Sequence, residues 1–204
     1  MKSELSRQLV HLAAIAFIIL SFYVDSVFVS AYSFVIAAGL LVYVVYFHME
    51  KKRLLRLVER IETPLRKTLL HLENRPSPSP KFAGAFWFFF SIGLSFAIFP
   101  LQIAQAAVLI LALGDSASTL IGRAIGEKRI LGKKTLEGSL SFFIFSLTSF
   151  IFVPSLVAIF GALIGALMEL IPELKIAEPL RSRGILNDNF LIPVIAGMAM
   201  WMIL

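Results

Sequence analysis

The sequence predicts an all-α, polytopic transmembrane bundle, because its apolar residues form long uninterrupted runs that its basic residues avoid. Of the 204 residues, 58% are hydrophobic and 16% are charged, whereas an ordinary soluble domain is roughly 45–50% apolar and about 25% charged. A spanning helix requires about 20 consecutive, mostly apolar residues. We therefore expect residues 1–204 to form a single integral membrane domain with about seven spans.

Seven apolar segments support this prediction. Their expected bounds are Leu9–Val24, Val27–Phe47, Phe82–Phe99, Leu101–Ile125, Ser139–Val153, Ser155–Ile171 and Phe190–Leu204. The uncharged stretch Leu140–Met168 is too long for one span, and Pro154 in its middle is a natural position for a turn. The first segment lacks a clear cleavage site, so we interpret it as a retained span and not as a signal peptide.

The basic residues predict the orientation of the bundle. All 19 Lys and Arg residues precede the first span or lie within residues 48–81, 123–134 and 172–189. With seven spans these regions share one side of the bilayer, and the positive-inside rule makes that side, with the N-terminus, cytoplasmic. The net charge of +6 is thus a topology signal and no sign of nucleic-acid binding. Because the chain has no cysteine, a thiolate metal site and a cysteine nucleophile are excluded.

Residues 48–81 are charged but patterned. Apolar residues recur at helical spacing from Leu54 to Leu72, which predicts a cytoplasmic amphipathic helix in the headgroup region. Thr63 and Pro64 have the residue types of a second helix start. The Pro-rich stretch at 74–80 predicts an extended connector into the third span.

Asp115 is the most unusual residue of the predicted fourth span. A carboxylate at that depth costs at least about 2.5–3.5 kcal/mol on insertion scales, so it requires a cation, a water-filled cavity or a proton. We interpret it as functional, although a protonated structural Asp would also fit. Gly114, Ser118, Gly122 and Gly126 repeat every four residues and predict close helix packing beside Asp115.

The lysine loop, residues 126–138, follows this span and has the composition of a phosphate-binding loop. Its glycines allow close backbone approach, Lys133 and Lys134 supply charge, and Thr135 and the adjoining Ser139 offer hydroxyls. The Walker A spacing is absent, and an ordinary positive-inside loop has a similar composition. Glu137 favours the phosphate interpretation, because a carboxylate beside lysines can hold a divalent cation against phosphates.

Further polar residues are expected on the same side of the membrane. Glu169 ends the sixth span and Asp188 precedes the last, so they join Asp115 and Glu137 as four candidate ligands for Mg²⁺. Taken singly, Glu169 could be a span-end acid and Asp188 a helix N-cap.

Near the N-terminus, Arg7 and His11 share a helical face, from which they could bind phosphate or steer a proton. A basic anchor beside an interfacial histidine explains these two residues equally well.

The run from Gly114 to Gly122, followed by Lys134-Thr135-Leu136-Glu137-Gly138-Ser139, resembles the CTP-dependent lipid-alcohol kinases. These include dolichol kinase, phytol kinase and a CTP-using diacylglycerol kinase, within the membrane cytidylyltransferase superfamily. The resemblance is close over residues 114–139 and weaker elsewhere. Arg7 and His11 are similar to an N-terminal family element, in which Gln8 here replaces a lysine.

The resemblance implies transfer of the γ-phosphoryl group of CTP to the hydroxyl of a membrane lipid alcohol, with Mg²⁺ as cofactor. The implied catalytic residues are Asp115, Lys134 and Glu137. The implied nucleotide or phosphate ligands are Arg7, His11, Gly122, Lys133, Lys134, Thr135, Gly138 and Ser139, and the implied metal ligands are Asp115, Glu137, Glu169 and Asp188.

Two alternatives stay open. A CTP:phospholipid cytidylyltransferase belongs to the same superfamily, but the C-terminal signature of that branch is missing here, which favours the kinase. A cation- or proton-coupled transporter could also use Asp115, yet the side opposite the basic residues offers only Asp25. The expected partners are the lipid acceptor, CTP and the bilayer, and the small-residue stripes would serve packing within one chain or in a homo-oligomer.

Overall fold

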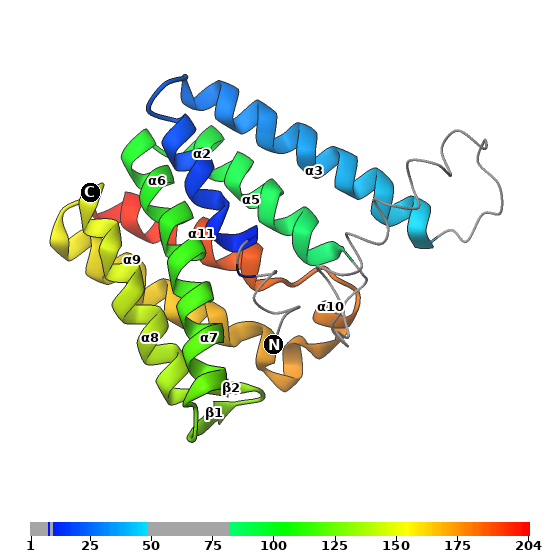
Figure 1. Ribbon diagram of the computed structural model, residues 1–204, viewed down its shortest axis with the longest axis vertical. Helices are drawn as coiled ribbons and strands as arrows, with labels where there is room; N and C mark the ends of the chain where they lie inside the picture. The colour runs from blue at the N-terminus through cyan, green and yellow to red at the C-terminus, as the bar shows by residue number, and fades with distance from the viewer. Residues whose placement is uncertain (1–7, 9, 49–81) are drawn as a thin grey trace.

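The computed structural model describes Gln8, residues 10–48 and residues 82–204, and these parts of the chain are mostly helical (Figure 1). The predicted all-α class is confirmed, with one small two-stranded hairpin added. Arg7 and the segments predicted as an amphipathic helix, a second helix start and a Pro-rich connector lie outside the described residues.

The helices follow the apolar segments closely. The principal helices are α2 (Ala14–Leu20), α3 (Ser26–His48), α5 (Ala83–Ile98), α6 (Leu101–Leu109), α7 (Ser116–Ala124), α8 (Leu136–Ser146), α9 (Ser155–Leu170), α10 (Glu178–Ser182) and α11 (Asp188–Ile203). The shorter elements are the π-helix η1 (Ile110–Asp115), the 3₁₀ helices η2 (Leu147–Ile151), η3 (Ile171–Glu173) and η4 (Lys175–Ala177), and strands β1 (Arg129–Leu131) and β2 (Lys134–Thr135). The predicted turn at Pro154 is confirmed, because η2 ends before this proline and α9 begins directly after it.

Three helical stretches among the described residues are long and apolar enough to cross a membrane. They are Ser26–Val45, Leu101–Ala124 and Ser155–Glu173. Four shorter apolar helices cover Val10–Leu20, Ala83–Ile98, Leu136–Ile151 and Asp188–Ile203. These lengths and compositions are compatible with a membrane protein. The count of seven spans stays a prediction.

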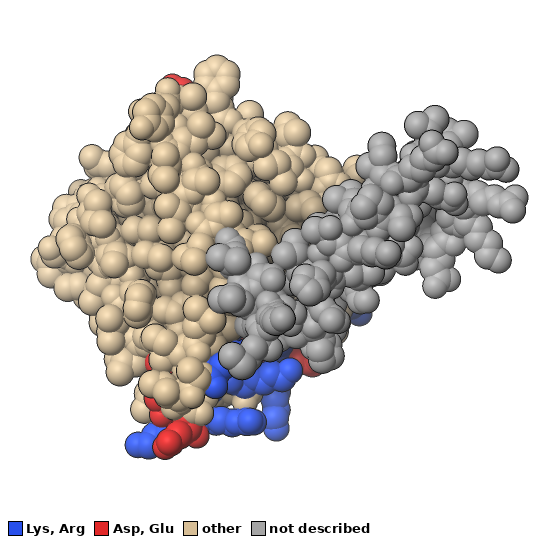
Figure 2. Space-filling model, viewed as in Figure 1, with Lys and Arg blue, Asp and Glu red and all other residues tan. Residues whose placement is uncertain are grey.

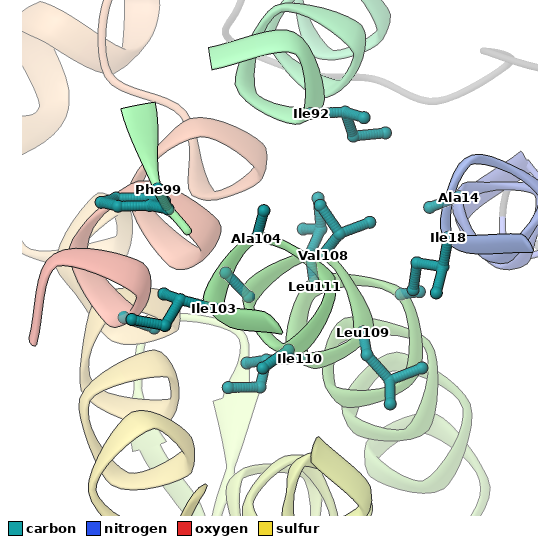
Figure 3. Packing of buried hydrophobic residues seen from close by; sticks show 14 of the residues in the cluster. Ala14, Ile18, Ile92, Phe99, Ile103, Ala104, Val108, Leu109, Ile110 and Leu111 are labelled. Atoms are coloured by element: carbon teal, nitrogen blue, oxygen red, sulfur yellow. The ribbon is translucent and has the colours of Figure 1, made fainter. Parts of the chain in front are cut away.

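The stretch formed by α6, η1 and α7 is the centre of the bundle. In its apolar part 83% of the residues are buried, compared with 22% for α3. Figure 3 shows side chains of this central stretch, including Val108 and Leu111, surrounded by Ile92 of α5 and by Ala14 and Ile18 of α2. Asp115, at the end of η1, therefore belongs to the most buried of these three long stretches.

Small residues allow α7 and α8 to approach closely. A Cβ atom added to Gly122 would lie 3.3 Å from the Cα atom of Gly138, and one added to Gly138 would lie 3.0 Å from the backbone oxygen of Ser118. Side chains at either glycine would therefore force the helices apart. The small-residue stripe predicted from Gly114 to Gly126 packs against α8 and the residue before it, as expected for close helix contacts.

The described Lys and Arg residues collect at one end of the bundle. Figure 2 shows the Lys and Arg side chains grouped at the end that carries β1 and β2. The turn between α2 and α3, which contains Asp25, lies at the other end (Figure 1). This arrangement agrees with the one-sided distribution in the sequence, and the cytoplasmic orientation stays a prediction.

Candidate functional site

Asp115 is held inside the protein at the point where the central helix leaves its π-helical turn. Only 3% of Asp115 is exposed. The π-helical stretch ends at Asp115, and such stretches occur frequently at functional sites. His11 Nδ1 lies 3.4 Å from Asp115 Oδ2, and the His11 ring packs 5.0 Å from the ring of Phe88, centroid to centroid. His11 therefore contacts the acid and is packed in place beside it.

Glu169 connects the lysine loop to the central helix. It is fully buried near the end of α9. Its Oε1 atom accepts a 2.7 Å hydrogen bond from Lys134 Nζ and a second hydrogen bond from the Ser118 hydroxyl of α7. Among the described residues, Glu169 Oε2 is buried without a hydrogen-bond partner. Glu169 thus acts on Lys134 directly, through a buried ion pair.

Lys134 lies within the field of three carboxylates. Burial by itself lowers the pKa of Lys134, but attraction to Glu169, Asp115 and Asp188 outweighs this effect, so the pKa is raised above its usual value of 10.5. Lys134 is therefore charged at neutral pH. Asp115, Glu169 and Asp188 come from three different helices, and all three attract the ammonium group of Lys134, which Glu169 contacts at 2.7 Å.

Glu137 and Thr135 close the hairpin onto the start of α8. The Thr135 side chain caps the helix by accepting a hydrogen bond from the Gly138 backbone N–H at 3.2 Å. The two carboxylate oxygens of Glu137 lie 3.3 and 3.4 Å from the Lys128 backbone nitrogen. Hydrogen bonds from its own backbone N–H, and from those of Lys128 and Glu127, lower the pKa of Glu137. These contacts give Glu137 a structural role that the sequence interpretation did not include.

Glu173 and Arg181 hold the tip of the hairpin, and sequence reasoning missed both. Glu173 Oε2 accepts a 3.2 Å hydrogen bond from the Lys133 backbone N–H, and its Oε1 atom lies 2.8 Å from Arg181 Nη2. The Lys133 backbone N–H is therefore bound to a carboxylate, while the predicted phosphate contact of the Lys133 side chain stays a prediction. The four-residue spacing from Glu169 to Glu173 was the available signal, because it repeats one acid per helical turn.

The start of α11 brings Asp188 to the same end of the bundle. Asn187, and not Asp188, is the N-cap residue, and its side chain accepts a 3.0 Å hydrogen bond from the Asn189 backbone N–H. The Asn189 side chain donates to the Gly84 carbonyl at 3.0 Å, and its own carbonyl accepts from the Ser91 hydroxyl at 2.7 Å. These contacts fix α11 against α5, so the position of Asp188 depends on a rigid support.

The structure brings together some of the site residues that were predicted from the sequence. His11, Asp115, Lys134, Glu169 and Asp188 are linked by contacts or by electrostatic attraction. The predicted phosphate ligands Gly122, Thr135 and Gly138 form the α7–α8 contact, and the buried hydroxyl oxygen of Ser139 has no hydrogen-bond partner among the described residues. Within the described residues, no three His, Asp or Glu side chains form a group that could hold a metal ion. The four-acid Mg²⁺ site stays a prediction.

No protein-family model, curated protein or solved structure matches this chain.

Proposed function

We propose that the protein is a kinase that transfers the γ-phosphoryl group of CTP to the hydroxyl of a membrane lipid alcohol, such as a polyprenol, a phytol-like isoprenoid or a diacylglycerol. The observation that carries this proposal is the grouping of Asp115, Glu169 and Asp188 around Lys134 at the charged end of an apolar bundle. CTP is assigned as the donor from the resemblance of residues 114–139 to the CTP-dependent lipid-alcohol kinases.

The chemistry of the site suits phosphoryl transfer, which depends mostly on positioning and on neutralisation of charge. Lys134 has the charge to bind a phosphate oxygen, and its contact with Glu169 holds the ammonium group in one place. A water-soluble nucleotide can approach from the charged end. A lipid alcohol can approach through the apolar sides of the bundle.

Asp115 is the proposed general base. It accepts the proton of the lipid hydroxyl while the hydroxyl oxygen forms a bond to the γ-phosphorus atom. The bond between that phosphorus and the β,γ-bridging oxygen breaks, and CDP leaves with the bond's electron pair. His11, 3.4 Å from Asp115 Oδ2, orients the carboxylate.

Mg²⁺ is the proposed cofactor. It takes oxygen ligands, usually one or two carboxylates together with substrate phosphates. We assign it to Asp188 and to the Asp115 oxygen that does not take the proton, because Glu169 is bound to Lys134 and Ser118, and both oxygens of Glu137 face the Lys128 amide. In Asp188, Oδ1 accepts a 3.0 Å hydrogen bond from the Asn189 backbone N–H. Bound there, Mg²⁺ would neutralise charge on the transferring phosphoryl group.

The test is an assay of purified protein with γ-labelled CTP, Mg²⁺ and a panel of lipid alcohols. We expect label in the lipid fraction with one class of acceptor. Asp115→Asn should lower the rate by about 100-fold or more, as loss of a general base does. Asp25→Asn is the matched control, because Asp25 is exposed in the turn between α2 and α3. The proposal is wrong if no acceptor is labelled, or if Asp115→Asn and Asp25→Asn are equally active.

A further inference from the structure

The tip of the β1–β2 hairpin is fastened to the segment that follows α9. We propose that Glu173, held by Arg181, is a positioning residue that docks the lysine loop and thereby fixes Lys134 among its carboxylates. The docking follows from the contacts of Glu173 alone. Its consequence for phosphate binding rests on the proposed kinase function.

The contacts of Glu173 form a continuous chain from the loop to the helix end. One carboxylate oxygen accepts from the Lys133 amide at 3.2 Å, and the other lies 2.8 Å from Arg181 Nη2. Arg181 Nη1 in turn donates to the Pro172 carbonyl at 3.2 Å. The side chains of Glu173 and Arg181 are 11% and 22% exposed, so water shields their attraction only in part. The hairpin tip is therefore held by charge-assisted hydrogen bonds.

Gly132 shows how closely the loop backbone approaches Glu173. Its φ angle is +54°, a left-handed conformation that favours glycine. A Cβ atom added at Gly132 would also collide with the Glu173 carboxylate. Both the backbone conformation and the closeness of Glu173 therefore require glycine at position 132 of the loop.

Glu169 and Glu173 together hold two consecutive residues of the loop. Glu169 binds the Lys134 side chain, while Glu173 binds the Lys133 backbone. Glu169 lies near the end of α9 and Glu173 ends the short helix η3 that follows it, so adjacent elements present both contacts to the hairpin. Loss of the Glu173 contact should free the tip, so that Lys134 occupies its position near Asp115 for a smaller fraction of the time.

Limited trypsin digestion tests the docking without any assay of activity. The loop contains four trypsin cleavage sites, at Lys128, Arg129, Lys133 and Lys134. Cleavage at these sites requires the hairpin to open, so its rate reports the open fraction. The rate is followed by intact-mass spectrometry as the appearance of fragments that begin directly after these residues.

The variants are designed around one matched control. Glu173→Gln removes the charge that binds Arg181, while Glu178→Gln makes the same change at an exposed glutamate of α10. We expect cleavage of the loop to be about tenfold faster in Glu173→Gln, as loss of one charge-assisted hydrogen bond predicts, and unchanged in Glu178→Gln. Gly132→Ala should reproduce the effect by displacing the Glu173 side chain. A variant is included in the comparison if its elution volume in size-exclusion chromatography and its far-ultraviolet circular dichroism match those of the wild type.

Kinetics distinguish positioning from a general loss of structure. If only the docked loop binds the nucleotide, Glu173→Gln should raise the KM for CTP several-fold and leave kcat at saturating CTP within about twofold. Equal loop cleavage in Glu173→Gln and Glu178→Gln would overturn the docking. A lower kcat at unchanged KM would overturn the positioning role. If the wild type transfers no label from CTP, the proposed function fails, and the digestion alone decides the docking.

Discussion

The buried pair of Lys134 and Glu169 allows a quantitative prediction of stability. Lys134→Met removes the ammonium group and leaves the fully buried Glu169 carboxylate facing an apolar side chain. Breaking a buried pair by removing one partner costs about 3–5 kcal/mol. We expect a value near the lower limit, about 3 kcal/mol, because Ser118 still donates to Glu169 and the carboxylate can bind a proton.

Substitution of the other partner, Glu169, should lower the free energy of unfolding by less. Glu169→Gln leaves Lys134 with 19% of its side chain exposed, and attraction to Asp115 and Asp188 remains. We therefore expect a loss of about 1–2 kcal/mol, close to that for one hydrogen bond to a charged group. In the double variant neither charge of the pair remains. Its loss in the free energy of unfolding should therefore be about 2 kcal/mol smaller than the sum of the losses in the two single variants.

The measurement is the free energy of unfolding at pH 7, obtained by titrating SDS into detergent micelles that contain the protein. Lys133→Met is the matched control, because Lys133 is exposed and contributes its backbone, not its side chain, to the contact with Glu173. Additive losses in the double variant, or equal losses in Lys134→Met and Lys133→Met, would refute the buried pair.

The same pair predicts a dependence on pH. Because the pKa of Lys134 is raised in the folded protein, its stabilising contribution is fully present below the unfolded value of 10.5. It is lost as the pH rises through the higher folded value. The difference in stability between the wild type and Lys134→Met should therefore stay constant from pH 7 to about pH 10 and shrink only above that.

Two further predictions concern the hairpin and the helix contact beside it. Because backbone hydrogen bonds lower the pKa of Glu137, its carboxylate stabilises the fold above pH 4.5, and this contribution is lost as the pH falls through the lower folded value. The difference in melting temperature between the wild type and Glu137→Gln should therefore shrink below pH 4.5. A constant difference would contradict this role. Gly138→Ala should cost about 1–3 kcal/mol by overpacking, because its Cβ atom would lie 3.0 Å from the Ser118 carbonyl. Gly39→Ala, with nothing within 4 Å of its Cβ position, should stabilise α3 by about 0.5–1 kcal/mol in the same unfolding titration; equal effects at the two glycines would contradict the close contact.

The sequence predicts the helices well, because long apolar runs leave little choice of secondary structure. The turn at Pro154 and the close packing of the stripe from Gly114 to Gly126 follow from residue type and spacing, whereas Gly138 as the packing partner of Gly122 does not. The π-helical turn before Asp115 could not be predicted in this way, since one added residue in a helical turn leaves the apolar composition unchanged.

The site was predicted in part, for a physical reason. Lys134 and Glu169 are charged side chains with little exposure to water, so each requires a partner, and the sequence indicated that they lie at one end of the bundle. Glu137 was ambiguous, because a carboxylate just after a threonine N-cap suits either a metal or a backbone N–H group. The spacing from Glu169 to Glu173 could have marked Glu173, but its pairing with Arg181 depends on how the chain folds back after α9.

CTP with one label on the α-phosphate and another on the γ-phosphate tests the central claim most directly. Purified protein, Mg²⁺ and a lipid-alcohol acceptor are combined, and both labels are counted in the lipid fraction. We predict that the γ label alone enters the lipid, while the α label stays in CDP. Entry of the α label with release of pyrophosphate, or no label in any lipid of the panel, would contradict the assignment as a lipid-alcohol kinase.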